Sequence, residues 1–221
     1  MKRNRFKAIL FDLDGTLLDT LQDLANSMNT VLNAHGMSTF PVDDYRTFVG
    51  KGLRELIRCV LPKDKVNDQT VDDFLASMRI EYSRRWAENT KPYPGIPELL
   101  DELQRMNLPM TVLSNKADEF TKIMVSALLP NWHFKIVYGL NSEFPAKPDP
   151  ASSLRIAHEL KIRPGDFIYL GDTDIDMQTA NAAGMYAVGA LWGFRTADEL
   201  KANGAKVLVE SPVQVRELFN L

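Results

Sequence analysis

The stretch FKAILFDLDGTLLDT, residues 6–20, decides the expected fold. Its apolar run Phe6–Phe11 stops at Asp12, which is typical of a buried strand that ends in a polar turn. From Asp19 onward the apolar residues recur at helical spacing, with Asp19 or Thr20 as the expected N-cap. The stretch therefore predicts a strand, a turn and a helix in that order.

The chain after this turn is predicted to be helical, with no strand between Leu18 and Glu88. The segment KPYPGIP, residues 91–97, carries three prolines around Gly95 and is the best candidate for a linker. The first helix is expected to stop at Gly36, and the others to lie around Asp43–Phe48, Leu53–Leu61 and Val71–Ala87.

Beyond residue 97 the predicted strands and helices alternate, which is typical of a parallel sheet covered by helices on both faces. The first strand belongs with this part. We therefore predict a Rossmann-like, doubly wound α/β core of residues 1–17 and 91–221, with a small α-helical cap domain, residues 18–90, inserted after the first strand. The expected strands are Met110–Ser114, Ile136–Gly139, Phe167–Leu170, Tyr186–Leu191 and Lys206–Val209, and the helices are Asp118–Leu128, Pro150–Leu160, Ile175–Gly184, Ala197–Ala202 and Val213–Phe219.

The composition argues against several classes of partner. The 221 residues carry a net charge of −3 without a basic cluster, so we expect neither a nucleic acid nor a membrane surface as partner. The basic and then apolar N-terminus is too short in its apolar part for a signal peptide. Cys59 is the single cysteine, which excludes an internal disulfide and predicts a cytoplasmic protein. Nothing in the composition indicates an oligomeric state.

Four polar clusters lie at the ends of predicted strands or just beyond them, and in a parallel sheet they would meet at one edge. They are residues 12–16, 114–116, 147–148 and 171–176. If the carboxylates gathered there, they would repel one another unless a cation lay between them. The histidines and Cys59 lie outside the clusters, and ligands that are all oxygens favour Mg²⁺ over Zn²⁺. The acidic residues concerned are Asp12, Asp14, Asp172 and Asp176.

The same clusters offer donors that suit a phosphate dianion: the Ser114 hydroxyl, the Lys147 charge and the backbone N–H groups of Leu13–Gly15. Each cluster also has a simpler explanation. Asp172 could cap the helix that follows it, Lys147 could be an exposed loop residue, and Ser114 could belong to an ordinary turn. The order of the clusters, each after its own strand, favours a site.

The segments FDLDGTLLDT, VLSNK, AKPDP and YLGDTDIDMQTANAAGM resemble the four signature motifs of the haloacid dehalogenase superfamily of phosphatases. The resemblance runs over nearly the whole chain. The helical block is similar to the small cap of that superfamily, and VGKGLRELI, residues 49–57, resembles the cap of phosphoglycolate phosphatase-like members. Ser114 stands where many relatives carry Thr, and either residue supplies a hydroxyl.

The resemblance implies a role for each motif residue. Asp12 would be the nucleophile that becomes an aspartyl phosphate, and Asp14 would protonate the leaving alcohol and then activate water. Mg²⁺ would be held by the Asp12 carboxylate, the backbone carbonyl of Asp14 and the Asp172 carboxylate, and Asp176 would either orient a metal-bound water or lie just outside the ligands. Ser114 and Lys147 would be catalytic as well, because they hold the transferring phosphoryl oxygens, and Lys147 would also offset the charge of Asp12. The residues predicted to bind the phosphate or the rest of the substrate are Leu13, Gly15, Thr16, Ser114, Asn115, Lys147 and Lys51.

We also expect Lys51, with Arg54, to reach the leaving group from the cap, although Lys51 could simply be solvated between two glycines. Asn115 and Lys116 are either accessory contacts or turn residues. The predicted function is hydrolysis of a small phosphorylated metabolite, with phosphoglycolate as the first candidate. The alternatives are a sugar phosphomutase, a carbon–halogen dehalogenase, which would not need Asp14, and a phospho-acceptor signalling module.

Overall fold

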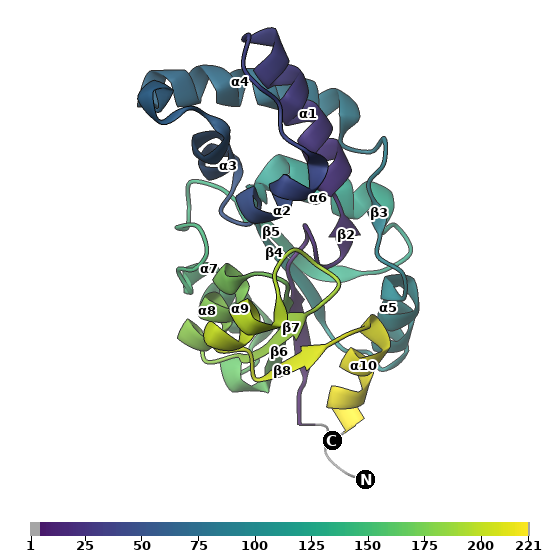
Figure 1. The fold of residues 1–221 in the computed structure, drawn as a ribbon. Coiled ribbons are helices and arrows are strands. Elements are labelled where there is room, and N and C mark those ends of the chain that lie inside the picture. Colours follow the sequence, from purple (N-terminus) through teal and green to yellow (C-terminus); the bar gives the residue numbers. More distant parts are fainter. Residues whose placement is uncertain (1–4, 221) are drawn as a thin grey trace.

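The computed structural model describes residues 5–220, and at its centre lies a six-stranded sheet with the order β5-β4-β1-β6-β7-β8 (Figure 1). Every pairing in this sheet is parallel, which confirms the predicted α/β class. Residues 1–4 and 221 of the predicted core lie outside the described part. The strands are β1 (Ala8–Phe11), β4 (Met110–Ala117), β5 (Phe134–Leu140), β6 (Phe167–Gly171), β7 (Tyr186–Ala190) and β8 (Val207–Val209).

Strand β1 is apolar throughout because both of its faces are covered. Ile9 and Phe11 belong to the larger hydrophobic cluster, whereas Ala8 and Leu10 belong to the smaller one. Alternating side chains of a strand point to opposite faces, so a central strand between two helical layers needs apolar residues at every position. The larger cluster includes residues of α5 (Ile96–Arg105), α6 (Asp118–Leu128) and α10 (Pro212–Glu217), and the smaller one includes residues of α7 (Ala151–Leu160), α8 (Asp174–Ala182) and α9 (Ala197–Ala202).

The chain leaves the core and returns to it through two short antiparallel strands, β2 (Leu18–Asp19) and β3 (Lys91–Pro92). The expectation of no strand after Leu18 was therefore wrong at this point. Figure 1 shows the helices between these strands gathered beyond the end of the sheet towards which β1 runs. We propose this helical part as the cap, bounded at 17/18 and 90/91. Its helices are α1 (Leu21–Ala34), α2 (Tyr45–Phe48), α3 (Leu53–Val60) and α4 (Asp68–Arg85).

Helices α4 and α5 differ from the expectation for local reasons. Helix α5 was missed because KPYPGIP was interpreted as a linker, whereas Pro97 lies in the first turn of α5, where proline is favoured. Helix α4 begins before Val71 because the Asn67 side chain accepts a hydrogen bond from the Thr70 N–H, 2.9 Å long. The four 3₁₀ segments are Val42–Asp44, which replaces the start of one predicted helix, Lys63–Lys65, Pro164–Asp166 and Leu218–Asn220.

No helix within residues 5–220 combines the length and the apolar character of a membrane span.

The buried carboxylate of Asp23 in α1 forms hydrogen bonds with the segment in which the chain returns from the cap to the core. Asp23 accepts hydrogen bonds from the backbone N–H groups of Asn89 (2.9 Å) and Thr90 (2.8 Å), and from the side chains of both residues, each at 2.7 Å. Burial raises the pKa of Asp23, but the hydrogen bonds from Asn89 and Thr90 outweigh it and lower that pKa below its ordinary value. The ionised form of Asp23 therefore stabilises the fold.

Replacing Asp23 by Asn should lower the free energy of unfolding by about 2 kcal/mol at neutral pH, because the charge-assisted hydrogen bonds are lost. The folded pKa of Asp23 lies below its unfolded value of 3.8, so this contribution is present above that pH and is lost as the pH falls through the folded pKa. Urea unfolding at about pH 7 and about pH 3 measures the effect, and the difference between the two proteins should shrink at the lower pH. Exposed Asp64→Asn is the control, and an equal loss there would contradict the assignment.

Candidate active site

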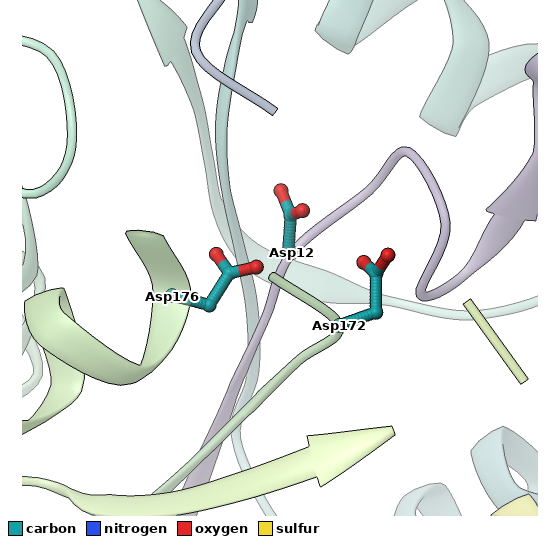
Figure 2. A group of neighbouring side chains, drawn as sticks. All are labelled: Asp12, Asp172 and Asp176. Atoms are coloured by element: carbon teal, nitrogen blue, oxygen red, sulfur yellow. The ribbon is translucent and has the colours of Figure 1, made fainter. Parts of the chain in front are cut away.

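Three carboxylates meet at the carboxyl end of the sheet (Figure 2). Asp12 directly follows β1 and Asp172 directly follows β6, and these strands are neighbours with Phe11 opposite Leu170. The third, Asp176, comes from the first turn of α8. One oxygen from each carboxylate lies within 4.8 Å of the others, and all three residues are buried. The expected gathering of acidic side chains is thus present for these three.

Lys147 lies among these carboxylates and is not an exposed loop lysine. Its Nζ is 2.8 Å from Asp12 Oδ1 and 2.7 Å from Asp176 Oδ1, and it donates to the Leu113 carbonyl at 3.2 Å. Only 3% of its side chain is exposed. Burial lowers the pKa of Lys147, but Asp12 and Asp176 raise it well above its ordinary value, so the ammonium stays charged.

The site still has an excess of negative charge. Burial, followed by repulsion from Asp176, raises the pKa of Asp12 to about 7 even though Lys147 lowers it. Burial, followed by Asp12 and Asp176, raises the pKa of Asp172 well above its ordinary value. One ammonium cannot offset three carboxylates at this distance, and a divalent cation would supply the missing charge. The donors are all oxygens, so the residues fit the predicted Mg²⁺.

Asp172 is held by groups from two loops. The Thr16 hydroxyl donates to Asp172 Oδ1 at 2.7 Å, and the Phe194 N–H donates to Oδ2 at 2.8 Å. Gly15 packs so closely that an added Cβ would lie 2.3 Å from Asp172 Oδ2, and its φ of 87° disfavours any side chain. The Trp192 indole donates to the Thr16 carbonyl at 3.0 Å. Sequence reasoning missed the loop of residues 191–196, because it has no periodic pattern.

Asp176 has both of its oxygens engaged within the protein. Its Oδ2 accepts from the Thr173 hydroxyl at 2.7 Å and from the Thr173 N–H at 3.0 Å. The Thr173 hydroxyl oxygen accepts in turn from the Asp176 N–H at 3.3 Å, so Thr173, and not Asp172, is the N-cap of α8. Its Oδ1 accepts from Lys147 and, at 3.3 Å, from the Tyr169 hydroxyl. This geometry suits a residue that positions Lys147 from beside the metal site.

Some of the predicted phosphate-binding residues line the cavity, whereas others already use their donor groups within the protein. Ser114 is buried and lines a cavity together with Asp12 and Asp14, as a phosphoryl contact would. The Gly15 N–H, however, already donates to the Leu18 carbonyl at 2.9 Å, so the expectation of a free donor there is not met. The Thr16 hydroxyl is taken up by Asp172. For Leu13 the backbone donor stays a prediction.

Asn115 joins the cap to the core. Its Nδ2 donates to the carbonyls of Gly50 and Lys147, both at 3.1 Å, and its Oδ1 accepts from the Lys147 N–H at 2.8 Å. A side chain at Gly52 would approach the Asn115 carbonyl at 3.1 Å, so the loop of residues 49–52 lies directly on this strand end. Asn115 therefore positions Lys147 and the cap loop through the same amide.

A second group of contacts, made by Arg195 and Arg46, holds the cap loop, which we define as residues 49–52. The Arg195 guanidinium donates to the Val49 carbonyl at 2.8 Å and also to the Arg46 carbonyl. Arg195 forms an ion pair with Asp174, in which Arg195 Nε lies 3.6 Å from Asp174 Oδ1. The Arg46 side chain donates to the Gly193 carbonyl at 2.9 Å. Arg195 also belongs to the loop that sequence reasoning missed.

A cavity of about 440 Å³ lies between this strand end and the cap helices. Asp14 lies at its core side, outside the group of three carboxylates, and its Oδ1 is 2.8 Å from Lys116 Nζ. Lys51 and Arg54 also line the cavity, but Lys51 is exposed and Arg54 forms an ion pair with Asp72, so their contact with a leaving group stays a prediction. The arrangement thus places the carboxylates of Asp12 and Asp14 and the Ser114 hydroxyl along one partly open cavity.

The sequence profile of the haloacid dehalogenase-like hydrolases matches residues 9–190. This chain belongs to that family. It is 34% identical over 188 residues to a phosphoglycolate phosphatase of Aquifex aeolicus, covering 85% of this chain and 86% of the relative. The phosphoglycolate phosphatase of Nitrosospira multiformis is 30% identical over 216 residues, with 96% and 95% covered.

A crystal structure from Lactobacillus delbrueckii subsp. bulgaricus, provisionally assigned as a phosphoglycolate phosphatase, superposes with a TM-score of 0.91 at 28% identity. The superposition covers 97% of this chain and 98% of that one. Together these comparisons confirm the predicted family, the fold and the enzyme class, a phosphatase.

Replacing Asn115 by Ala should loosen the cap loop and the Lys147 segment together. We expect faster amide hydrogen exchange in residues 49–53 and a loss of about 1–3 kcal/mol in the free energy of unfolding, because the Lys147 N–H loses its acceptor. Exchange measured by mass spectrometry and urea unfolding check this result. Exposed Asn131→Ala is the matched control, and unchanged exchange in Asn115→Ala would contradict the role of the amide.

Proposed function

We propose that this chain is a Mg²⁺-dependent phosphomonoester hydrolase that works through an aspartyl-phosphate intermediate. The observation that carries the proposal is the position of Asp12. Its carboxylate is buried beside Asp172, held by Lys147, and faces the cavity that Asp14 and Ser114 also line. A carboxylate in this position can attack a phosphorus atom whose leaving group points into the cavity.

In the first step an Asp12 oxygen forms a bond to phosphorus while the bond from phosphorus to the alcohol oxygen breaks. Asp14 gives its proton to that oxygen. A water molecule then attacks phosphorus, Asp14 takes up a proton from the water, and the bond to Asp12 breaks to release phosphate. Lys147 and Ser114 would bind the oxygens of the transferring group throughout.

Asp12, the backbone carbonyl of Asp14 and Asp172 would hold Mg²⁺, which supplies positive charge to the phosphoryl oxygens and the carboxylates. Asp176 would keep Lys147 in place, since each of its oxygens accepts two hydrogen bonds from protein groups, whereas each Asp172 oxygen accepts one. The remaining work is done by fixed charges and hydrogen-bond donors, which is most of what phosphoryl transfer requires.

The substrate we propose is a small phosphorylated metabolite, with phosphoglycolate as the first candidate. Two relatives named phosphoglycolate phosphatase, at 34% and 30% identity over most of this chain, support this choice. The cytoplasmic location stays a prediction that rests on the single cysteine.

Replacing Asp12 by Asn should lower kcat by about 10³-fold or more, because an amide cannot form the acyl phosphate. Release of inorganic phosphate from p-nitrophenyl phosphate and from phosphoglycolate measures the loss. The control is Asp149→Asn, an exposed aspartate near Lys147, which should keep activity within about threefold of the unmodified protein. Full turnover by Asp12→Asn would contradict the mechanism.

The intermediate itself should become visible in Asp14→Asn. Since p-nitrophenol leaves without a proton donor, the first step should proceed in this variant while hydrolysis of the aspartyl phosphate is slowed. Mass spectrometry after an acid quench should then show one added phosphoryl group on the peptide that contains Asp12. Its absence, together with steady turnover, would argue for direct attack by water.

Mg²⁺ should stabilise the protein in a pH-dependent way. The folded pKa of Asp12, about 7 without a metal, exceeds its unfolded value of 3.8, so the metal-free protein should lose stability as the pH rises from about 4 through about 7. Mg²⁺ binds the ionised carboxylate, so the increase in Tm that it causes should grow between about pH 5 and about pH 8. Thermal unfolding with EDTA or with Mg²⁺ measures this increase. Asp172→Asn should abolish it, and an increase that survives this change would place the metal elsewhere.

A further inference from the structure

Lys116 lies on the leaving-group side of the proposed reaction centre. It belongs to β4, two residues after Ser114, and its side chain is only 7% exposed. Its Nζ is 2.8 Å from Asp14 Oδ1 and lies over the Tyr82 ring, 4.7 Å from the ring centre. Since Asp14 is the group that would protonate the leaving alcohol, the Lys116 ammonium lies beside the place where that alcohol is held.

The two buried lysines of the site have different surroundings. Lys147 lies between two carboxylates, Asp12 and Asp176. Lys116 is paired with the single carboxylate of Asp14 and with the face of Tyr82. An ammonium has three N–H donors, so Lys116 retains capacity for an anionic group in the cavity that it lines. Burial lowers the pKa of Lys116, but Asp14 and Tyr82 raise it above its ordinary value, and the charge is kept.

The other cations around the cavity are less suited to this task. Arg54 is paired with Asp72, Arg79 is paired with Glu119, and Lys51 is exposed. The walls near Lys116 are mostly apolar, and in such surroundings a charge–charge contact is stronger than in water. The apolar lining from the cap and from α6 comprises Leu53, Leu56, Leu75, Met78 and Phe120.

We propose that Lys116 is the residue that selects the substrate, by binding a carboxylate carried by the leaving alcohol. The class of substrate is therefore a phosphate monoester of a short hydroxy acid. This inference rests on the proposed phosphatase function, and it moves the recognition of the leaving group from Lys51 and Arg54 to the core lysine. Lys116 would contact both the Asp14 carboxyl group, which carries the proton for the leaving alcohol in the first step, and the carboxylate of the substrate, and so place the alcohol oxygen next to Asp14.

The test compares phosphoglycolate with ethyl phosphate, which has a similar length and no carboxylate. The unmodified protein should prefer phosphoglycolate in kcat/KM by about 10- to 100-fold, the range expected for a charge-assisted hydrogen bond in a buried site. In Lys116→Met this preference should fall to within about threefold of unity, mainly through a higher KM for phosphoglycolate. Lys116→Arg should keep most of the preference, because it keeps the charge.

Lys122→Met, at an exposed lysine of α6, is the matched control and should leave the preference unchanged. Thermal unfolding shows whether each variant is folded. If Lys116→Met lowers kcat/KM equally for both substrates, Lys116 acts only through Asp14 and the proposal is overturned. The same conclusion follows if the unmodified protein does not prefer phosphoglycolate.

Binding to the Asp12→Asn protein tests the contact without turnover. Titration calorimetry should show that phosphoglycolate binds more tightly than ethyl phosphate, and that adding Lys116→Met removes the difference. Equal affinities for the two esters would overturn the proposal even if hydrolysis is observed. Failure of the proposed function looks different, because the unmodified protein would then release no phosphate from any ester, p-nitrophenyl phosphate included.

Discussion

The repulsion among buried carboxylates at the end of the sheet is the constraint on which the rest of the structure depends. Parallel pairing of β1 with β6 brings Asp12 beside Asp172, and the first turn of α8 adds Asp176. Lys147 offsets part of the charge, and it does so from a loop that Asn115 and Asp176 hold in place. The negative charge that remains is what a divalent cation, bound there as proposed, would offset.

The three carboxylates differ in function because their surroundings differ. Asp176 is saturated by Thr173, Lys147 and Tyr169, so it serves to position its neighbours. Asp172 is oriented by a hydroxyl and a backbone N–H, an arrangement that suits a metal ligand. Asp12 is held by Lys147 and faces the cavity, and its pKa of about 7 shows how strongly burial and Asp176 oppose its charge. In the proposed function the same residue type would thus supply a nucleophile, a metal ligand and a support.

The cap is joined to the core by contacts that run through the loops of the candidate site. Asn115 binds the Gly50 carbonyl with the same amide that fixes Lys147, and Arg195 binds the Val49 carbonyl from the loop that also positions Asp172. Placement of the cap loop is therefore coupled to the geometry of the reacting groups. The cap also contributes the aromatic face over which Lys116 lies, so the leaving-group side of the site is formed by both parts of the chain.

The sequence by itself determined the class of fold, because apolar strands that alternate with helices form a parallel sheet. It also predicted that polar residues at or after the strands, Asp12, Ser114 and Asp172 among them, meet at one edge of that sheet. It could not reveal the short strands β2 and β3, since a two-residue pairing has no periodicity. It also could not reveal α5, because the prolines of residues 92–97 indicated a linker. Only the tertiary structure decided which groups form ion pairs and hydrogen bonds with one another. The pairs Lys116–Asp14 and Arg195–Val49 join residues about a hundred positions or more apart, and such contacts follow from packing, which local sequence patterns do not encode.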